Sequence, residues 1–480
     1  MMEEKTIFKK VVNTNGVFSC DELDITVEEW KKVLQDSLVY NNYKLWLARF
    51  YQEVEHKATC KYMGEKYKCS SQTPNSKVQA GMKASINTQS SLAQTQALWR
   101  FVHNDNISYQ ELSKPLLENS LQGCREECKR YGLVMHDWSR IALTHSNKTD
   151  TYAMSHKTDV GYELQSSILV SDINGSPIAT PAQNLITANS VHSSYQKTPT
   201  KQTHLNELTD RIEYLDQQGF DKPLVHIIDR EADSAFHMRQ WEEGNHHFII
   251  RSKAGSYLSY KGKSQRSSQI AEQLDFKYER QVSYKGRLAH QYIASANVVL
   301  TRPAKPKAVD PNTGKRVTPI KGEPTSLVLV VSRIYDNKDK LLATWYLLTN
   351  LQGDEVPAGE VSQWYYWRWQ IESYFKLLKS AGQHLEQWLQ QSGNAFFKRL
   401  LIASQACTLV WRLMQASDKQ SREFVLFLVR LSGRQMKRSK PITAPAVMAG
   451  LFQWLNFNEL VNHYSPDDLK YFAETARKLV

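Results

Sequence analysis

Cysteine is scarce in this sequence, and its six positions form no recognisable metal-binding pattern. No two cysteines stand in a C-x2-C pair, and the fourteen histidines form no ligand-like cluster. These absences exclude a zinc-finger arrangement and predict reduced thiols. The pair Cys124 and Cys128, one helical turn apart, is the one place where metal binding stays open as an alternative.

Long apolar stretches are also missing. No run approaches the roughly 18 apolar residues that a membrane-spanning helix needs. The first residues, MMEEKTIFKK, are charged and lack the apolar core of a signal peptide. We therefore expect a cytoplasmic protein with no membrane partner.

Positive charge is in excess. The chain has 61 Lys and Arg against 49 Asp and Glu, which gives a net charge of +12. Such a balance favours a polyanionic partner, and nucleic acid comes first because attraction to phosphates grows with positive charge. A basic protein without such a partner remains the alternative at this point.

Polar and apolar residues divide the 480-residue chain into segments of different character. Strand and helix patterns alternate in the second segment, which predicts an α/β layer with a mixed sheet. The predicted segments are 1–130, helical with a polar linker near 57–90; 131–255, α/β; 256–350, β-rich; 351–390, with a prominent helix; and 391–480, helical.

Three acids occupy positions that suit metal-dependent chemistry. Asp229 ends the apolar run KPLVHIID, Asp137 follows another apolar run at an expected hairpin, and Glu372 lies on a helix predicted over 364–380. Ligands of open α/β sheets bind at the carboxyl ends of strands. Carboxylates from separate segments can hold Mg²⁺ beside a phosphate. Taken singly, each is as well explained as an ordinary strand-end or surface acid.

The helix around Glu372 carries a narrow polar stripe. At about 100° per residue, Tyr365, Arg368, Glu372, Lys376 and Lys379 fall within roughly 80° of one another. One acid, three bases and a tyrosine make a poor core face but suit a metal beside a phosphate backbone. A solvated helix face with Glu372–Lys376 pairing explains the stripe equally well.

The pattern Y-x2-R-x3-E-x6-K, formed by Tyr365, Arg368, Glu372 and Lys379, resembles the signature of the DDE transposases of the insertion-sequence-four family. The motif DREAD (229–233), followed by FIIRSK (248–253), and the position of Asp137 match the same family in order and spacing. The resemblance covers roughly residues 90–400. It departs from the family at Trp138, where relatives usually carry a small hydroxyl residue.

This resemblance implies an RNase H-like α/β core with an inserted β-rich domain, flanked by helical N- and C-terminal domains for DNA binding and dimerisation. It implies that Asp137, Asp229 and Glu372 are the catalytic residues and the ligands of two Mg²⁺ ions, which Mn²⁺ can replace. The residues implied to contact DNA are Tyr365, Arg368, Lys376, Lys379, Arg251, Lys253 and Trp345. For Trp345 a place in a strand core is the alternative to stacking on a DNA base.

The implied function is cut-and-paste transposition of a bacterial insertion sequence by strand hydrolysis, hairpin formation and strand transfer. Its partners would be double-stranded DNA, as transposon ends and target, and a second copy of the chain. Two alternatives stay open: a nuclease of the same fold that only hydrolyses DNA, and an inactive DNA-binding relative.

Overall fold

The computed structural model describes residues 99–143, 148–154, 156–304, 318–434 and 442–465, together with a few positions beyond 465. The helix and the polar linker expected before residue 90 lie outside the described residues.

The centre of the fold is a mixed sheet, which confirms the predicted α/β class. Its middle strands follow the spatial order β4-β3-β1-β6-β7. The pairs β1–β3 and β3–β4 are antiparallel, whereas β1–β6 and β6–β7 are parallel. This arrangement is consistent with an RNase H-like core. The strands span Gly132–Ala142 (β1), Val160–Ser171 (β3), Pro177–Ile186 (β4), Leu224–Ile228 (β6) and His247–Ser252 (β7).

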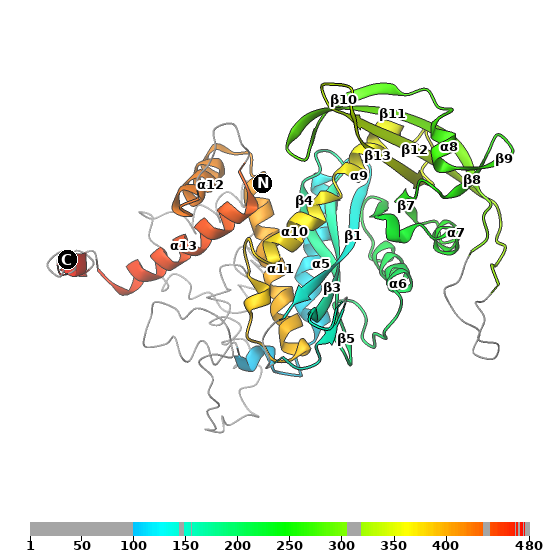
Figure 1. The fold of residues 1–480 in the computed structure, drawn as a ribbon. Helices are drawn as coiled ribbons and strands as arrows, with labels where there is room; N and C mark the ends of the chain where they lie inside the picture. Colours follow the sequence, from blue (N-terminus) through cyan, green and yellow to red (C-terminus); the bar gives the residue numbers. More distant parts are fainter. Residues whose placement is uncertain are drawn as a thin grey trace.

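The β-rich segment continues this sheet instead of forming a separate layer. Strand β13 pairs antiparallel with β7, where Leu347 stands opposite Arg251. The result is one thirteen-stranded sheet, which rises through β13, β12 and β11 to the top of the molecule in Figure 1. These strands span Tyr257–Tyr260 (β8), Lys263–Arg266 (β9), Lys277–Tyr284 (β10), Arg287–Leu300 (β11), Thr325–Tyr335 (β12) and Leu341–Thr349 (β13). Backbone pairing across β7 and β13 leaves no open sheet edge between the two parts.

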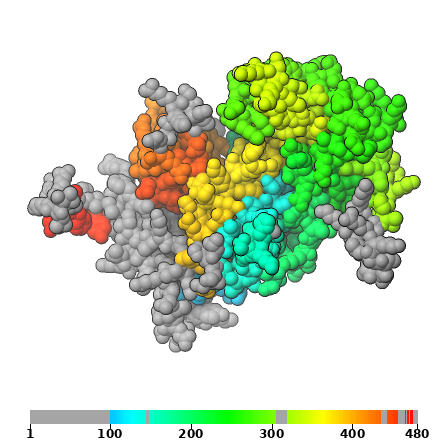
Figure 2. All heavy atoms as spheres, in the orientation of Figure 1, coloured from blue at the N-terminus to red at the C-terminus, as the bar shows by residue number. Residues whose placement is uncertain are grey.

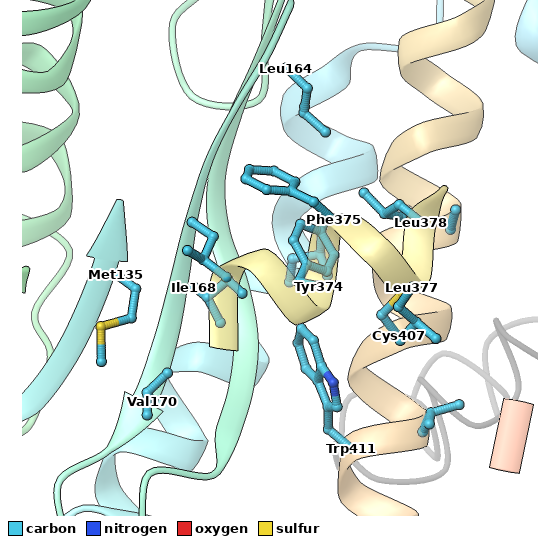
Figure 3. Close-up of a cluster of buried hydrophobic side chains, with 14 of the residues drawn as sticks. Met135, Leu164, Ile168, Val170, Tyr374, Phe375, Leu377, Leu378, Cys407 and Trp411 are labelled. Atoms are coloured by element: carbon cyan, nitrogen blue, oxygen red, sulfur yellow. The ribbon is translucent and has the colours of Figure 1, made fainter. Parts of the chain in front are cut away.

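Helices cover both faces of the central strands (Figure 1). Alternate side chains of β1 and β6 point to opposite faces. Met135 and Ile227 enter the core beneath α10 and α11, whereas Val134 packs with Leu215 of α6 on the other face. Figure 3 shows the first of these cores, where Ile168 and Val170 of β3 meet apolar side chains of the two helices. The helices span Tyr109–Glu127 (α5), His204–Asp216 (α6), Ala235–Glu243 (α7), Trp369–Leu378 (α10), Gly393–Gln415 (α11), Lys419–Leu431 (α12) and Ala444–His463 (α13).

The helix expected over 364–380 is two helices. α9 (Ala358–Tyr366) ends two residues before α10 begins. At the joint the backbone N–H of Arg368 donates to Tyr365 O at 3.1 Å, an i to i−3 bond that tightens the turn. The indole of Trp367 packs against Gly175, where a Cβ atom would lie 2.5 Å from the ring. Uniform helical spacing therefore does not hold across the stripe.

Two further sequence expectations concern cysteines and membranes. Cys124, Cys128 and Cys407 are buried and free of disulfides. Over the described ranges, no helix has the length and apolar character to cross a membrane.

Candidate active site

The strand register brings Asp137 and Asp229 to one level of the sheet. Met135 of β1 stands beside Ile227 of β6, and this is the last pair of the parallel ladder. Each aspartate lies two residues farther on, and a two-residue step returns a strand to the same face. Both acids therefore lie on the same side of the sheet, just past the point where the two strands stop pairing.

One sequence expectation is corrected here. Asp137 lies within β1 and not at a hairpin, because β1 stays paired with β3 as far as the Ala142–Gly161 pair. Asp137 lies just beyond the stretch of β1 that pairs with β6, because β6 ends at Ile228 while β1 runs on to Ala142.

Glu372 reaches the same place from α10. The apolar side chains Tyr374, Phe375 and Leu378 bury one side of this helix (Figure 3). The helix contacts β1 and β3, so the polar edge that carries Glu372 borders the strand ends.

Arg368 joins two of the three acids. Its Nη1 atom donates to Asp137 Oδ2 at 2.8 Å, and its Nη2 atom donates to Glu372 Oε1 at 2.5 Å. Only 14% of the Arg368 side chain is exposed. A buried guanidinium with two carboxylate partners is a strongly held geometry, because both of its forks are satisfied.

The electrostatics indicate that the third acid is close to the other two. Burial raises the pKa of Asp137, and the negative charge of Asp229 raises it further, while Arg368 opposes both effects. Glu372 behaves in the same way: burial raises its pKa, Arg368 opposes the shift, and Asp137 and Asp229 add to it. Asp137 and Glu372 thus both respond to the negative charge of Asp229.

A backbone N–H holds each aspartate in place. Trp138 N donates to Asp137 Oδ1 at 2.9 Å. Glu231 N donates to Asp229 Oδ1 at 2.8 Å, at the start of a short 3-10 turn over Arg230–Ala232. Both carboxylates are therefore oriented by the residues that follow them.

The donor chemistry of this cluster fits a divalent cation. Three carboxylates supply the hard oxygen ligands that Mg²⁺ prefers, and a cation would relieve their mutual repulsion. No three acidic, histidine or cysteine side chains in the described part of the chain are already arranged to hold an ion. Because Arg368 stands between Asp137 and Glu372, we expect it to release a carboxylate when an ion binds.

The segment after Asp229 is built around a buried acid. Asp233 accepts hydrogen bonds from Lys253 N at 2.8 Å and Ser252 Oγ at 3.2 Å, and it pairs with Arg302. These hydrogen bonds hold the backbone at the end of β7, so the exposed Lys253 side chain extends from a fixed backbone position. Asp233 therefore has a structural task here.

Two of the predicted DNA-contacting residues lie near each other. Tyr365 is buried, which raises its pKa, and the positive charges of Arg368 and Arg251 oppose that shift. Arg251 of β7 therefore lies close to Tyr365 of α9.

The two predicted lysines differ in their surroundings. Lys376 is exposed on the last turn of α10. Lys379 caps that helix, donates to the backbone carbonyl of Arg140 and pairs with Glu386 at 3.7 Å. Figure 2 shows the yellow segment that contains α10 reaching the surface between the orange helices and the green strands.

Trp345 and Trp369 contrast in the same way. Trp345 is 6% exposed, and its ring centroid lies 5.6 Å from that of Tyr365. This placement favours the core alternative that the sequence left open. Trp369, which the sequence reasoning missed, is 58% exposed and is the one exposed tryptophan among the described residues. Its position three residues before Glu372 was the available signal.

Known proteins similar to this chain include a family of transposase domains. Residues 178–411 match the family model described as "Transposase DDE domain". The range contains Asp229 and Glu372, whereas Asp137 precedes it. No curated protein matches the sequence.

Among solved structures, one similar chain is the piggyBac transposase in a cryo-EM synaptic complex with hairpin DNA. The identity is 8% and the TM-score 0.33, over 74% of this chain and 59% of that one. The chain therefore spans little more than half the length of that transposase, and so distant a likeness carries no argument about function.

Residues 178–411, slightly less than half of the chain, are similar to a transposase DDE domain, and the three acids of the site suit metal-dependent phosphoryl transfer.

Proposed function

We propose that this chain is a cut-and-paste DNA transposase of the insertion-sequence-four family. The observation that supports this most directly is the clustering of three acids: Asp137 and Asp229 leave adjacent parallel strands side by side, and Arg368 connects Asp137 to Glu372. Such a cluster at strand ends suits phosphoryl transfer.

In this proposal Asp137, Asp229 and Glu372 hold two Mg²⁺ ions. The bound metal would activate the attacking oxygen and stabilise the leaving one. The protein's own side chains orient the DNA. Arg368, already beside the acids, would turn to a phosphate near the scissile bond, because a phosphate competes well for a guanidinium.

The DNA would approach over the exposed side of α10. Lys376 and Trp369 stand on this side, in the last and first turns of the helix. A lysine can neutralise a phosphate, and an exposed indole can stack on an unpaired base. Lys379, Arg251, Lys253 and Tyr365 would extend the contact on either side.

The remaining segments would serve assembly. Residues 1–130 would bind the end of the element, and the helical segment 391–480 would join two chains, because two ends must be held together. Residues 256–350 would form the inserted domain on the common sheet.

The test is a reaction of the purified chain with DNA that carries the inverted repeats flanking its gene, in Mg²⁺. Nicks, hairpins and strand-transfer products are expected in sequence. Hydrolysis without hairpins or joined products would favour a nuclease of the same fold instead. Binding without any cleavage would favour an inactive relative.

A further inference from the structure

His204 lies behind the candidate active site, on the opposite face of the sheet. It is the first residue of α6, whose N-cap is Thr203. Its ring contacts side chains from three separate segments: β1, β3 and the turn after β6. Two of these segments carry a proposed metal ligand.

The first contact leads to Asp137. The rings of His204 and Trp138 lie 4.5 Å apart, centroid to centroid. Trp138 is the residue whose backbone N–H donates to the Asp137 carboxylate. The position of His204 therefore bears on the backbone that orients Asp137.

The second contact leads to Asp229. His204 Nδ1 lies 2.9 Å from Glu231 Oε1, and Glu231 is the residue whose backbone N–H donates to the Asp229 carboxylate. One imidazole thus contacts both residues that hold the two aspartates.

The third contact anchors the ring to the sheet. His204 Nε2 lies 3.0 Å from Glu163 Oε1 on β3. The hydrogen bonds to Glu163 and Glu231 raise the pKa of His204 to about 10. Both ring nitrogens therefore donate at neutral pH, and the protonated imidazole forms an ion pair with each of the two glutamates.

We propose that His204 is a positioning residue that fixes the spacing of Asp137 and Asp229 by clamping Trp138 to Glu231. This inference rests on the proposed function, since it assumes that the two aspartates bind metal together. It also gives a reason for Trp138 at a position where a small residue was expected: the indole supplies the surface against which His204 packs.

The experiment measures Mn²⁺ affinity of the full chain by isothermal titration and by the electron paramagnetic resonance of the free ion. Groups that orient metal ligands from behind typically change affinity by about 10- to 100-fold. We expect His204→Ala to weaken Mn²⁺ binding by about tenfold while DNA binding without metal is unchanged. His204→Arg should recover part of the affinity, because arginine can both pair with the glutamates and stack on Trp138.

The matched control is His237→Ala. His237 also connects α6 with the segment after β6, through Asn206 Oδ1 at 3.0 Å and Ser234 Oγ at 2.8 Å, but it reaches neither aspartate-holding residue. Its loss should leave Mn²⁺ affinity unchanged. An equal loss in both variants would reduce the role of His204 to general stability of α6.

Two further results decide the matter. If wild type binds Mn²⁺ and His204→Ala binds it equally well, the positioning role is wrong. If wild type binds no Mn²⁺, the proposed metal site itself fails. Should His204→Ala not fold, Glu231→Ala and Trp138→Ala each break one contact. Both should weaken Mn²⁺ binding, and unchanged affinity in both would overturn the inference.

Discussion

The two halves of the large sheet differ in how far neighbouring strands stay paired. The half that contains the parallel pairs β1–β6 and β6–β7 is here called the parallel half. In it, β6 is only five residues long, and its partner β1 runs on past it. In the antiparallel half, β11 and β12 stay paired from His290–Tyr335 to Leu300–Thr325. Asp137 and Asp229 lie where the pairing of β1 with β6 stops, because side chains beyond that point are not covered by a neighbouring strand. Continuous pairing instead buries its central side chains, Trp345 among them.

The largest effect should come from the acids gathered beside the parallel half. Asp229→Ala and Glu372→Ala should each lower DNA cleavage by about 1,000-fold or more, since each removes charge stabilisation at the reacting phosphate. Binding of the element's end should persist without metal, because removing an acid lessens repulsion of phosphates.

Gel shifts beside cleavage assays in Mg²⁺ measure both quantities. Glu126→Ala, which removes an exposed acid of α5, is the control and should leave both unchanged. Parallel loss of binding and cleavage would mean that these acids are structural.

The antiparallel half should respond in stability first. Trp345→Ala should destabilise the fold by about 3–5 kcal/mol, as buried tryptophans do. Trp369→Ala should change stability by less than about 0.5 kcal/mol, because its indole is exposed. Thermal melting of the two variants side by side tests this contrast.

The same pair of variants tests base stacking. If Trp369 holds an unpaired base, its loss should cost about 1–3 kcal/mol in hairpin formation and spare first-strand nicking. A stable Trp345→Ala variant with an altered nick-to-hairpin ratio would return that role to Trp345.

A smaller effect concerns pH and the contacts of His204. Its pKa rises from 6.5 to about 10 in the folded chain. A raised histidine pKa stabilises the fold fully below the unfolded value, and that stability disappears as pH rises through the folded value. The difference in unfolding free energy between wild type and His204→Ala should therefore shrink from about pH 6.5 to about pH 10. Urea titrations at three pH values measure it, and a constant difference would contradict the ion pairs.

The smallest effect separates the two lysines of α10. Lys376→Ala should lower the slope of log affinity against log salt by about one unit, as loss of one phosphate contact does. Lys379→Ala should lower it by less, because Lys379 already bonds the Arg140 carbonyl and Glu386. Equal slopes for the two variants would show that Lys379 leaves those partners for DNA.

Several elements followed from local pattern alone. The run LVHII forms β6 as predicted, since a short, fully apolar segment suits a buried strand. Helix α6 likewise forms where the apolar residues of HLNELTDRIEYLD recur at helical spacing. In contrast, β4 was missed. Its polar and small residues Thr180, Gln183 and Asn184 look like a loop, and only tertiary packing buries them.

The sequence by itself determined which groups the enzyme has: three acids in order, a basic stripe and the strands that lead to them. Tertiary structure decided how those groups meet. It broke the expected helix at Trp367, whose indole packs against Gly175, and it placed Arg368 between two acids. It also brought His204 behind them. Such contacts join residues far apart in the chain, so no local pattern encodes them, and they depend on strand register and on which helix covers which face.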